Sequence, residues 1–156
     1  MNDGTHIRRA SAAEIAEIIR QRRGMFQDMG FTESSALEMM QRTSEQFIRE
    51  AVGAGVYHQW FAETYDSRAS GGVAVLTYRW VSSPRNPRPE KAYILNMYVY
   101  PEFRGRGVAR QLMTEAIQWC RGQGFLYVDL HASEMGMRLY EKLGFKPTNE
   151  MRLELR

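Results

Sequence analysis

The stretch YVYPEFRGRGVARQL, residues 98–112, passes from a strand-like run into a helical one through a loop of glycines and arginines. Pro101 ends the apolar run, and Gly105 and Gly107 precede the return of apolar residues at helical spacing. The first turn of a helix has unpaired N–H groups and the positive end of the helix dipole, so it attracts anions. Glycine lets a ligand approach the backbone, and arginine suits phosphate oxygens. We therefore expect a pyrophosphate-binding loop at 104–110, although a glycine turn with solvated arginines also fits the loop taken alone.

Two known phosphate motifs compete for this loop. The Walker pattern G-x-x-x-x-G-K-[ST] is absent from the sequence. Gly105 and Gly107 begin the dinucleotide-binding pattern G-x-G-x-x-G. Asp129 follows at about the sequence separation at which an acidic residue of such a domain binds the ribose. Arg110, however, stands where the third glycine packs the helix against its strand. The loop also comes late in the chain, after a region with antiparallel character, which disfavours a dinucleotide-binding domain.

The composition is that of an ordinary globular protein. The chain has 156 residues, of which 44% are hydrophobic and 25% charged, and its formal net charge is +3. This length predicts one domain over 1–156, and so weak a positive charge makes nucleic acid an unlikely partner. Cys120 has no second cysteine to pair with, which fits a reducing compartment. No apolar run approaches the ~20 residues of a membrane span, and MNDGTHIRRAS lacks a signal-peptide core. We expect a cytoplasmic protein without a membrane partner.

The N-terminal half predicts one strand and two helices. Residues 6–10 form a short strand, and SAAE (11–14) is a capping box that starts a helix. That helix is expected to break where Gly24 and Gly30 bracket the sequence MFQDM. A second helix is expected at 33–52.

The remaining sequence changes from helical to strand periodicity and back. The expected elements are strands at 56–65, 72–81, 92–100, 125–131 and 151–155 and helices at 105–121 and 133–145. Three prolines make 82–91 a loop. Only the strand 92–100, helix and strand 125–131 form a parallel βαβ unit, while the other strands form a meander. The expected fold is therefore mixed α+β, with a mostly antiparallel central sheet and about four helices.

At this point the sequence resembles a known family. RGRGVA (104–109) matches the R/Q-x-x-G-x-G/A signature of the GCN5-related N-acetyltransferase (GNAT) family, with Arg104, Gly107 and Ala109 at its defined positions. LYEKLGF (139–145) resembles the family's late helix and the strand that follows it. The element order is similar over nearly the whole chain.

The resemblance implies a fold in which the fourth and fifth strands splay apart and acetyl-CoA lies in the cleft. Its pantetheine arm would pair with the backbone of Met97, Tyr98 and Val99. The residues implied for the pyrophosphate are Arg104, Gly105, Arg106, Gly107, Val108, Ala109 and Arg110. Ser133 stands where many members have a cofactor-contacting asparagine, so it is a candidate cofactor contact or only a helix cap. No metal site is expected.

The acetylation of an amine needs a proton acceptor for the nitrogen and a proton donor for the sulfur. Tyr140 resembles the family tyrosine that protonates the leaving sulfur, although by spacing alone it also fits a core tyrosine. The fourth strand offers Asn96, which can orient an amine or a water but cannot take a proton. The candidates for the base are the side chains Glu63, Glu90, His58, His131 and Asp129, and loss of the proton to water is a further route.

The sequence thus predicts an enzyme that moves an acetyl group from acetyl-CoA to a primary amine of a small molecule, by direct attack in a ternary complex. Three alternatives stay open: a protein acetyltransferase, an aminoacyl-tRNA acetyltransferase and a non-catalytic acyl-CoA sensor. A homodimer is also expected, formed through the strand 151–155 or through the exposed hairpin.

Overall fold

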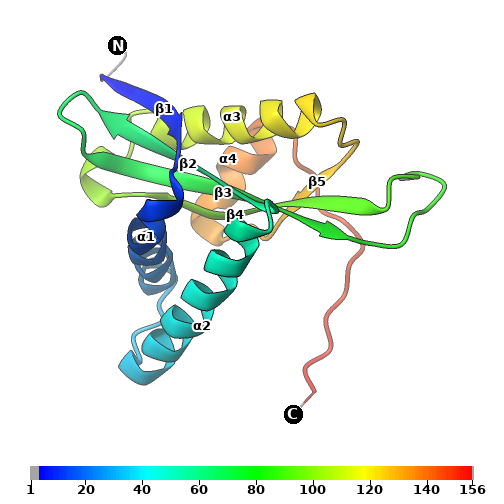
Figure 1. Ribbon diagram of the computed structural model, residues 1–156, viewed down its shortest axis with the longest axis horizontal. Helices are drawn as coiled ribbons and strands as arrows, with labels where there is room; N and C mark the ends of the chain where they lie inside the picture. The colour runs from blue at the N-terminus through cyan, green and yellow to red at the C-terminus, as the bar shows by residue number, and fades with distance from the viewer. Residues whose placement is uncertain (1–3, 156) are drawn as a thin grey trace.

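A computed structural model describes residues 4–155, in which helices lie against both faces of a twisted sheet (Figure 1). The strands are β1 (Thr5–Arg9), β2 (Tyr57–Thr64), β3 (Ala69–Arg79), β4 (Glu90–Val99) and β5 (Val128–Leu130). The α-helices are α1 (Ile15–Asp28), α2 (Ser34–Gly53), α3 (Val108–Gly122) and α4 (Glu134–Lys142), and short 3-10 turns occupy Ala12–Glu14 and Pro101–Phe103. This confirms the mixed fold with four helices.

The five strands lie in the sheet in sequence order. The pairs β1–β2, β2–β3 and β3–β4 are antiparallel, and β4 pairs with β5 in parallel. The parallel pairing is short, running from Ala92 opposite Val128 to Ile94 opposite Leu130. The predicted βαβ unit is therefore confirmed, and β4 continues well past the last residue that β5 covers.

A separate apolar core fills each face of the sheet. Helix α3 and Tyr140 of α4 pack on one face around Leu112, Met113 and Ala116, which are fully buried. Helices α1 and α2 pack on the other face around the buried side chains of Ile18 and Ile48. In Figure 1, α3 and the pair α1–α2 accordingly lie on opposite sides of the strands. A residue of this protein therefore faces either the α3 side or the α1–α2 side of the sheet.

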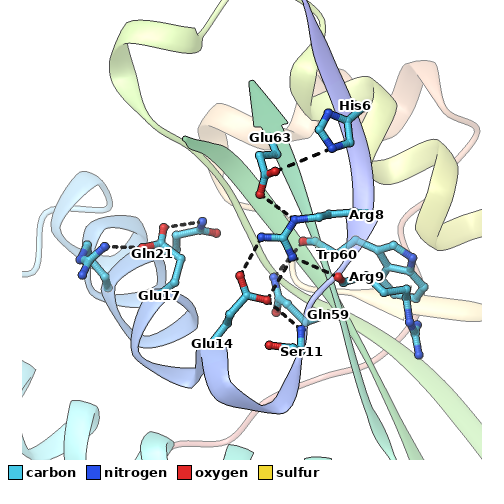
Figure 2. Close-up of polar contacts among 11 residues, drawn as sticks. His6, Arg8, Arg9, Ser11, Glu14, Glu17, Gln21, Gln59, Trp60 and Glu63 are labelled. Atoms are coloured by element: carbon cyan, nitrogen blue, oxygen red, sulfur yellow. Dashed lines mark hydrogen bonds and ion pairs between the residues drawn. The ribbon is translucent and has the colours of Figure 1, made fainter. Parts of the chain in front are cut away.

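An ionic cluster fixes the entry into α1 (Figure 2). Glu14 accepts a hydrogen bond of 2.8 Å from the backbone N–H of Ser11, as the capping-box pattern predicts. Arg8 of β1 donates to Glu14 at 2.7 Å and to Glu63 of β2 at 2.6 Å. The hydrogen bond from Arg8 is the main cause that lowers the pKa of Glu14 to about 2. One arginine thus joins two strands to the start of the helix.

Helix α1 is longer than expected at its glycines. It runs through Gly24 without a break and ends at Asp28, before Gly30 takes a φ of +95°. A Cβ at Gly24 would lie 2.7 Å from the hydroxyl oxygen of Tyr98. Gly24 therefore allows α1 to approach β4 closely. From the neighbouring sequence alone, a glycine with this role cannot be distinguished from one that ends a helix.

The expectation of a strand at 151–155 is wrong. Residues 146–155 form neither helix nor strand, and the segment leads away from the sheet in Figure 1. Met151, Leu153 and Leu155 are exposed by 97%, 81% and 89%. Alternation of apolar residues predicts which face of a strand is buried, but a strand also needs a sheet edge in register.

Strand β5 is shorter than the expected 125–131. Phe125 donates its N–H to the carbonyl of Cys120, so the chain is still leaving α3 at this point. Among residues 4–155, no helix is long and apolar enough to cross a membrane.

Candidate functional site

The β4–β5 pairing ends beside a cavity. Beyond Ile94 and Leu130 the two strands have no pairing, and a cavity of about 570 Å³ opens along the rest of β4. Its walls are the end of α1, Met97–Val99 of β4, the loop from Phe103 to Arg110, and the start of α4. The expected cleft is thus formed by strand divergence.

A β-bulge in β4 lies at the mouth of this divergence. Leu95 pairs with Ala74 and Tyr98 with Gly72, so β4 has one residue more than β3 between these two pairs. Asn96, within the bulge, has a φ of +54°. Bulges bend a strand and release backbone groups from the ladder. The segment Met97–Val99, expected to meet the pantetheine arm, follows directly and lines the cavity.

The Asn96 side chain is only 3% exposed, and both ends of its amide are paired. Its oxygen accepts from Arg22 at 2.6 Å, and its nitrogen donates to the hydroxyl oxygen of Tyr57 at 2.7 Å. Burial is the main cause that raises the pKa of Tyr57, and burial also lowers the pKa of Arg22. The amide therefore ties α1 and β2 to the bulge rather than pointing free toward an acceptor.

The N-terminus of α3 forms the phosphate-sized end of the cavity. Gly105 and Gly107 have φ values of +75° and +82°, and a Cβ at either position would meet nothing within 4 Å. Within residues 4–155, the N–H groups of Gly107, Val108, Ala109 and Arg110 have no protein acceptor. Because these groups converge on open space at a helix start, they fit an anion.

The arginines of this loop have different surroundings. Arg104 forms an ion pair with Asp28 of α1 and donates from Nε to the carbonyl of Val99 at 2.9 Å. Its side chain therefore closes the loop against α1 and β4 in this structure. The Arg106 guanidinium lies 5.9 Å from the centre of the Phe103 ring, and Arg110 lines the cavity.

The opposite wall is the start of α4. The Ser133 hydroxyl accepts a hydrogen bond of 3.2 Å from the N–H of Gly136, which confirms its expected role as N-cap. Ser133 also lines the cavity, so both of its expected roles are compatible with its position. At the other end of α4, Gly144 has a φ of +94°, as expected of a residue that follows a helix.

Tyr140 lies at the boundary between the α3-side core and the cavity. It is 7% exposed and is one of the cavity-lining residues. Burial raises the pKa of its phenol, so the hydroxyl keeps its proton at neutral pH. Its hydroxyl has no hydrogen-bond partner among the described residues and is available to a ligand.

The structure separates the candidates for the base. Glu63 is held by Arg8, and Glu90 accepts from Arg88 at 2.9 Å. The His58 ring lies 4.2 Å from the Trp119 ring, and burial is the main cause that lowers its pKa. Asp129 lies opposite Tyr93 in the parallel pairing, and His131 comes directly after that pairing ends. Only these last two candidates lie at the divergence of β4 and β5.

Several lining residues could not be assigned to the site from the sequence. Met25 and Asp28 of α1, with Met29 directly after the helix, form one wall, and Gly136 lies against the ring of Tyr140. The methionines of MFQDM fit either the floor of an adaptable pocket or ordinary core packing, so the sequence alone did not decide whether this segment meets the cavity. No group of His, Cys, Asp and Glu within residues 4–155 is arranged to hold a metal ion.

A sequence profile of the Acetyltransferase (GNAT) family matches residues 23–145, which include the cavity walls described above. The chain belongs to this family. Among curated relatives, glucosamine 6-phosphate N-acetyltransferase of Trypanosoma brucei brucei is 30% identical over 105 residues, 65% of this chain and 68% of that protein. Human N-acetyltransferase 8B is 33% identical over 94 residues, 58% of this chain, but the match spans only 39% of that protein.

Solved structures agree with this assignment over nearly the full chain. A GCN5-related N-acetyltransferase from Ralstonia eutropha JMP134 is 29% identical, with a TM-score of 0.90 over 97% of this chain and 99% of that one. A predicted acetyltransferase with acetyl-CoA from Clostridium acetobutylicum has a TM-score of 0.87 over 97% and 96%, at 23% identity. The second likeness shows a shared fold alone.

Proposed function

We propose that this GNAT protein transfers an acetyl group from acetyl-CoA to a primary amine of a small molecule. The observation that carries the proposal is the cavity itself, which has four N–H groups without acceptors at one end and the Tyr140 hydroxyl along its wall. A phosphate-binding end and a proton donor in one cavity suit a phosphate-bearing thioester.

Acetyl-CoA would supply the acetyl group as a thioester. The N–H groups of 107–110 would bind the pyrophosphate oxygens, with Arg110 beside them, and backbone groups of Met97–Val99 would align the pantetheine arm. Tyr140 would give its proton to the departing sulfur. Its raised pKa suits an acid that stays protonated until it is needed.

A small amine is the acceptor class that fits best with the relatives. The Trypanosoma relative acts, by its name, on glucosamine 6-phosphate, a small amino sugar phosphate. Protein acetylation, tRNA acetylation and acyl-CoA sensing without turnover remain alternative outcomes of the test below.

The test combines binding with turnover. Calorimetry with CoA should give saturable binding, and wild-type protein with acetyl-CoA should acetylate at least one of glucosamine 6-phosphate, 2-phenylethylamine and N-α-acetyl-lysine, detected by mass spectrometry. CoA binding without acetylation of any of these, or of proteins and RNA in a cell extract, would leave a sensor. Absence of CoA binding would contradict the proposal at its base.

A further inference from the structure

The histidine at the end of β5 forms a titratable cluster that the proposed chemistry has not yet used. The Tyr93 hydroxyl of β4 is hydrogen-bonded to Nδ1 of His131, and Nη2 of Arg152 lies 3.0 Å from Nε2 of the same ring. Resting on the proposed function, we propose that His131 is the general base that takes the proton from the acceptor amine, with Tyr93 as its positioning residue.

The register places His131 at the point where the strands part. Leu130 pairs with Ile94, which is the last pair, and His131 is the next residue. Met97, three residues after Ile94, and Ser133, two residues after His131, both line the cavity. His131 therefore lies at the point of divergence, two residues before the cavity wall at Ser133.

Alternation along the strands places the base and the acid on opposite faces of the sheet. Leu130 packs against the α3-side core, as do Ala92 and Ile94 of β4. Tyr93, between these two, therefore belongs to the other face, and His131 is hydrogen-bonded to it there. Tyr140 belongs to the α3-side core. An amine can therefore meet His131 from the α1–α2 side while the sulfur meets Tyr140 from the α3 side. This separation suits a reaction in which one group loses a proton and another gains one.

The two hydrogen bonds of the His131 ring fix its tautomer. An arginine side chain only donates, so Nε2 must be the accepting nitrogen toward Arg152. Nδ1 then carries the proton and donates it to the oxygen of Tyr93. Burial is the main cause that raises the pKa of Tyr93, so its phenol stays neutral. The basic lone pair of His131 therefore lies on Nε2, the nitrogen that faces the Arg152 guanidinium.

The surroundings of His131 also suit a cation. Tyr93 and Arg152 contact His131. The charged and titratable groups that act in turn on Tyr93 are Tyr78 of β3, Asp129 of β5, and Glu150 and Arg152 of the C-terminal segment. After burial, the charges of Asp129 and Glu150 also raise the pKa values of Tyr78 and Tyr93, so the field of both carboxylates reaches this cluster. An acceptor amine would replace the Arg152 guanidinium at Nε2.

The proposed step balances in atoms and protons. The amine nitrogen forms a bond to the acetyl carbon and gives one proton to Nε2 of His131. The carbon–sulfur bond breaks, and the sulfur takes one proton from the Tyr140 hydroxyl. His131 then releases its proton to solvent, and Tyr140 regains one from solvent, so the products are one amide and one thiol.

The kinetic test compares His131→Gln with wild type, using whichever of the three amines named above is acetylated fastest. The variant should lose at least about 10²-fold in kcat, the low end of general-base contributions. Wild-type kcat should fall in acid, because protonation removes the accepting lone pair of the base, and this fall should be absent in the variant. CoA affinity should stay within twofold. His6→Gln is the matched control, because His6 is an exposed histidine on β1, far along the chain from the cleft.

A second readout needs no turnover. Nitrogen NMR of the ligand-free protein should show His131 with its proton on Nδ1, and Tyr93→Phe should weaken that preference and lower kcat. The opposite tautomer, or a His131→Gln variant that keeps both wild-type kcat and the wild-type acidic fall, would overturn the inference and leave the proposed function intact. Wild-type protein that acetylates no acceptor would overturn both.

Discussion

Gly136 lies directly against the ring of Tyr140, which follows it by one helical turn in α4. A Cβ at position 136 would be 2.6 Å from Cε2 of that ring and 3.0 Å from its hydroxyl oxygen. Real Cβ contacts are not this short, so the missing side chain sets where the phenol can lie. The glycine thereby positions the proposed acid at the cavity wall, although it carries no chemistry itself.

Gly136→Ala should therefore reduce turnover by displacing Tyr140. Alanine favours a helix over glycine by up to about 1 kcal/mol, so the fold should survive while kcat falls about tenfold. Gly122→Ala at the end of α3 is the matched control, because a Cβ there meets nothing within 4 Å. Melting temperature and kcat measured together separate the effects, and an unchanged kcat in Gly136→Ala would show that the ring position is not set by this contact.

Gly107→Val tests the anion-binding end of the cavity. The added side chain enters open space beside the free N–H groups, so CoA affinity should fall at least tenfold, about 1.4 kcal/mol. Valine is also strained at a φ of +82°, and Gly55→Val carries a similar strain at +71° between α2 and β2. Calorimetric titration should show weakened CoA binding only for Gly107→Val. Equal affinities in the two variants would remove the phosphate assignment.

Because of the Arg8–Glu14 contact, the free energy of unfolding should decrease at acidic pH. Because the pKa of Glu14 is lowered from 4.5 to about 2, its stabilisation is complete above pH 4.5 and is lost as the pH falls toward 2. Glu14→Gln should lower the free energy of unfolding at pH 7 by about 1 kcal/mol and flatten that dependence.

Glu45→Gln, which removes an exposed ion pair with Arg49, is the control and should cost under about 0.5 kcal/mol. Urea denaturation at several pH values measures both variants. Equal losses would mean that Glu14 acts as an ordinary surface charge.

Arg152→Gln should favour the binding of the amine. The guanidinium occupies the accepting side of His131, so an acceptor must first displace it. Removing this competition should lower the KM for the amine several-fold and leave the KM for acetyl-CoA unchanged. A raised KM for the amine would instead make Arg152 part of the acceptor site.

The sequence was most informative where local chemistry and long-range packing agree. The glycine turn before α3, the cap at Ser133 and the parallel βαβ unit all follow from short patterns, and the structure confirms them. The segment 151–155 has the alternation of a strand but no adjacent sheet edge in register, so the prediction of a strand there was wrong. The expected homodimer therefore loses one of its two proposed edges and stays a prediction.

The parts of the site that could not be predicted depend on contacts between distant segments. Gly24 resembles a helix end but allows α1 to approach Tyr98. His131 was one of five possible bases, and only the end of the β4–β5 pairing distinguishes its position. The sequence left Asn96 able to orient an amine or a water, but Arg22 and Tyr57 pair with its amide from two other elements.

Turnover by Tyr140→Phe is the most direct test of the account. The substitution keeps the ring that packs against Gly136 and removes only the hydroxyl, so CoA affinity and melting temperature should stay near wild type. With saturating acetyl-CoA and amine, and with chemistry limiting the rate, kcat should fall by about 10² or more while the KM for acetyl-CoA changes little. A phenylalanine variant that keeps wild-type kcat under these conditions would contradict the role of Tyr140 as the acid and return it to a packing residue.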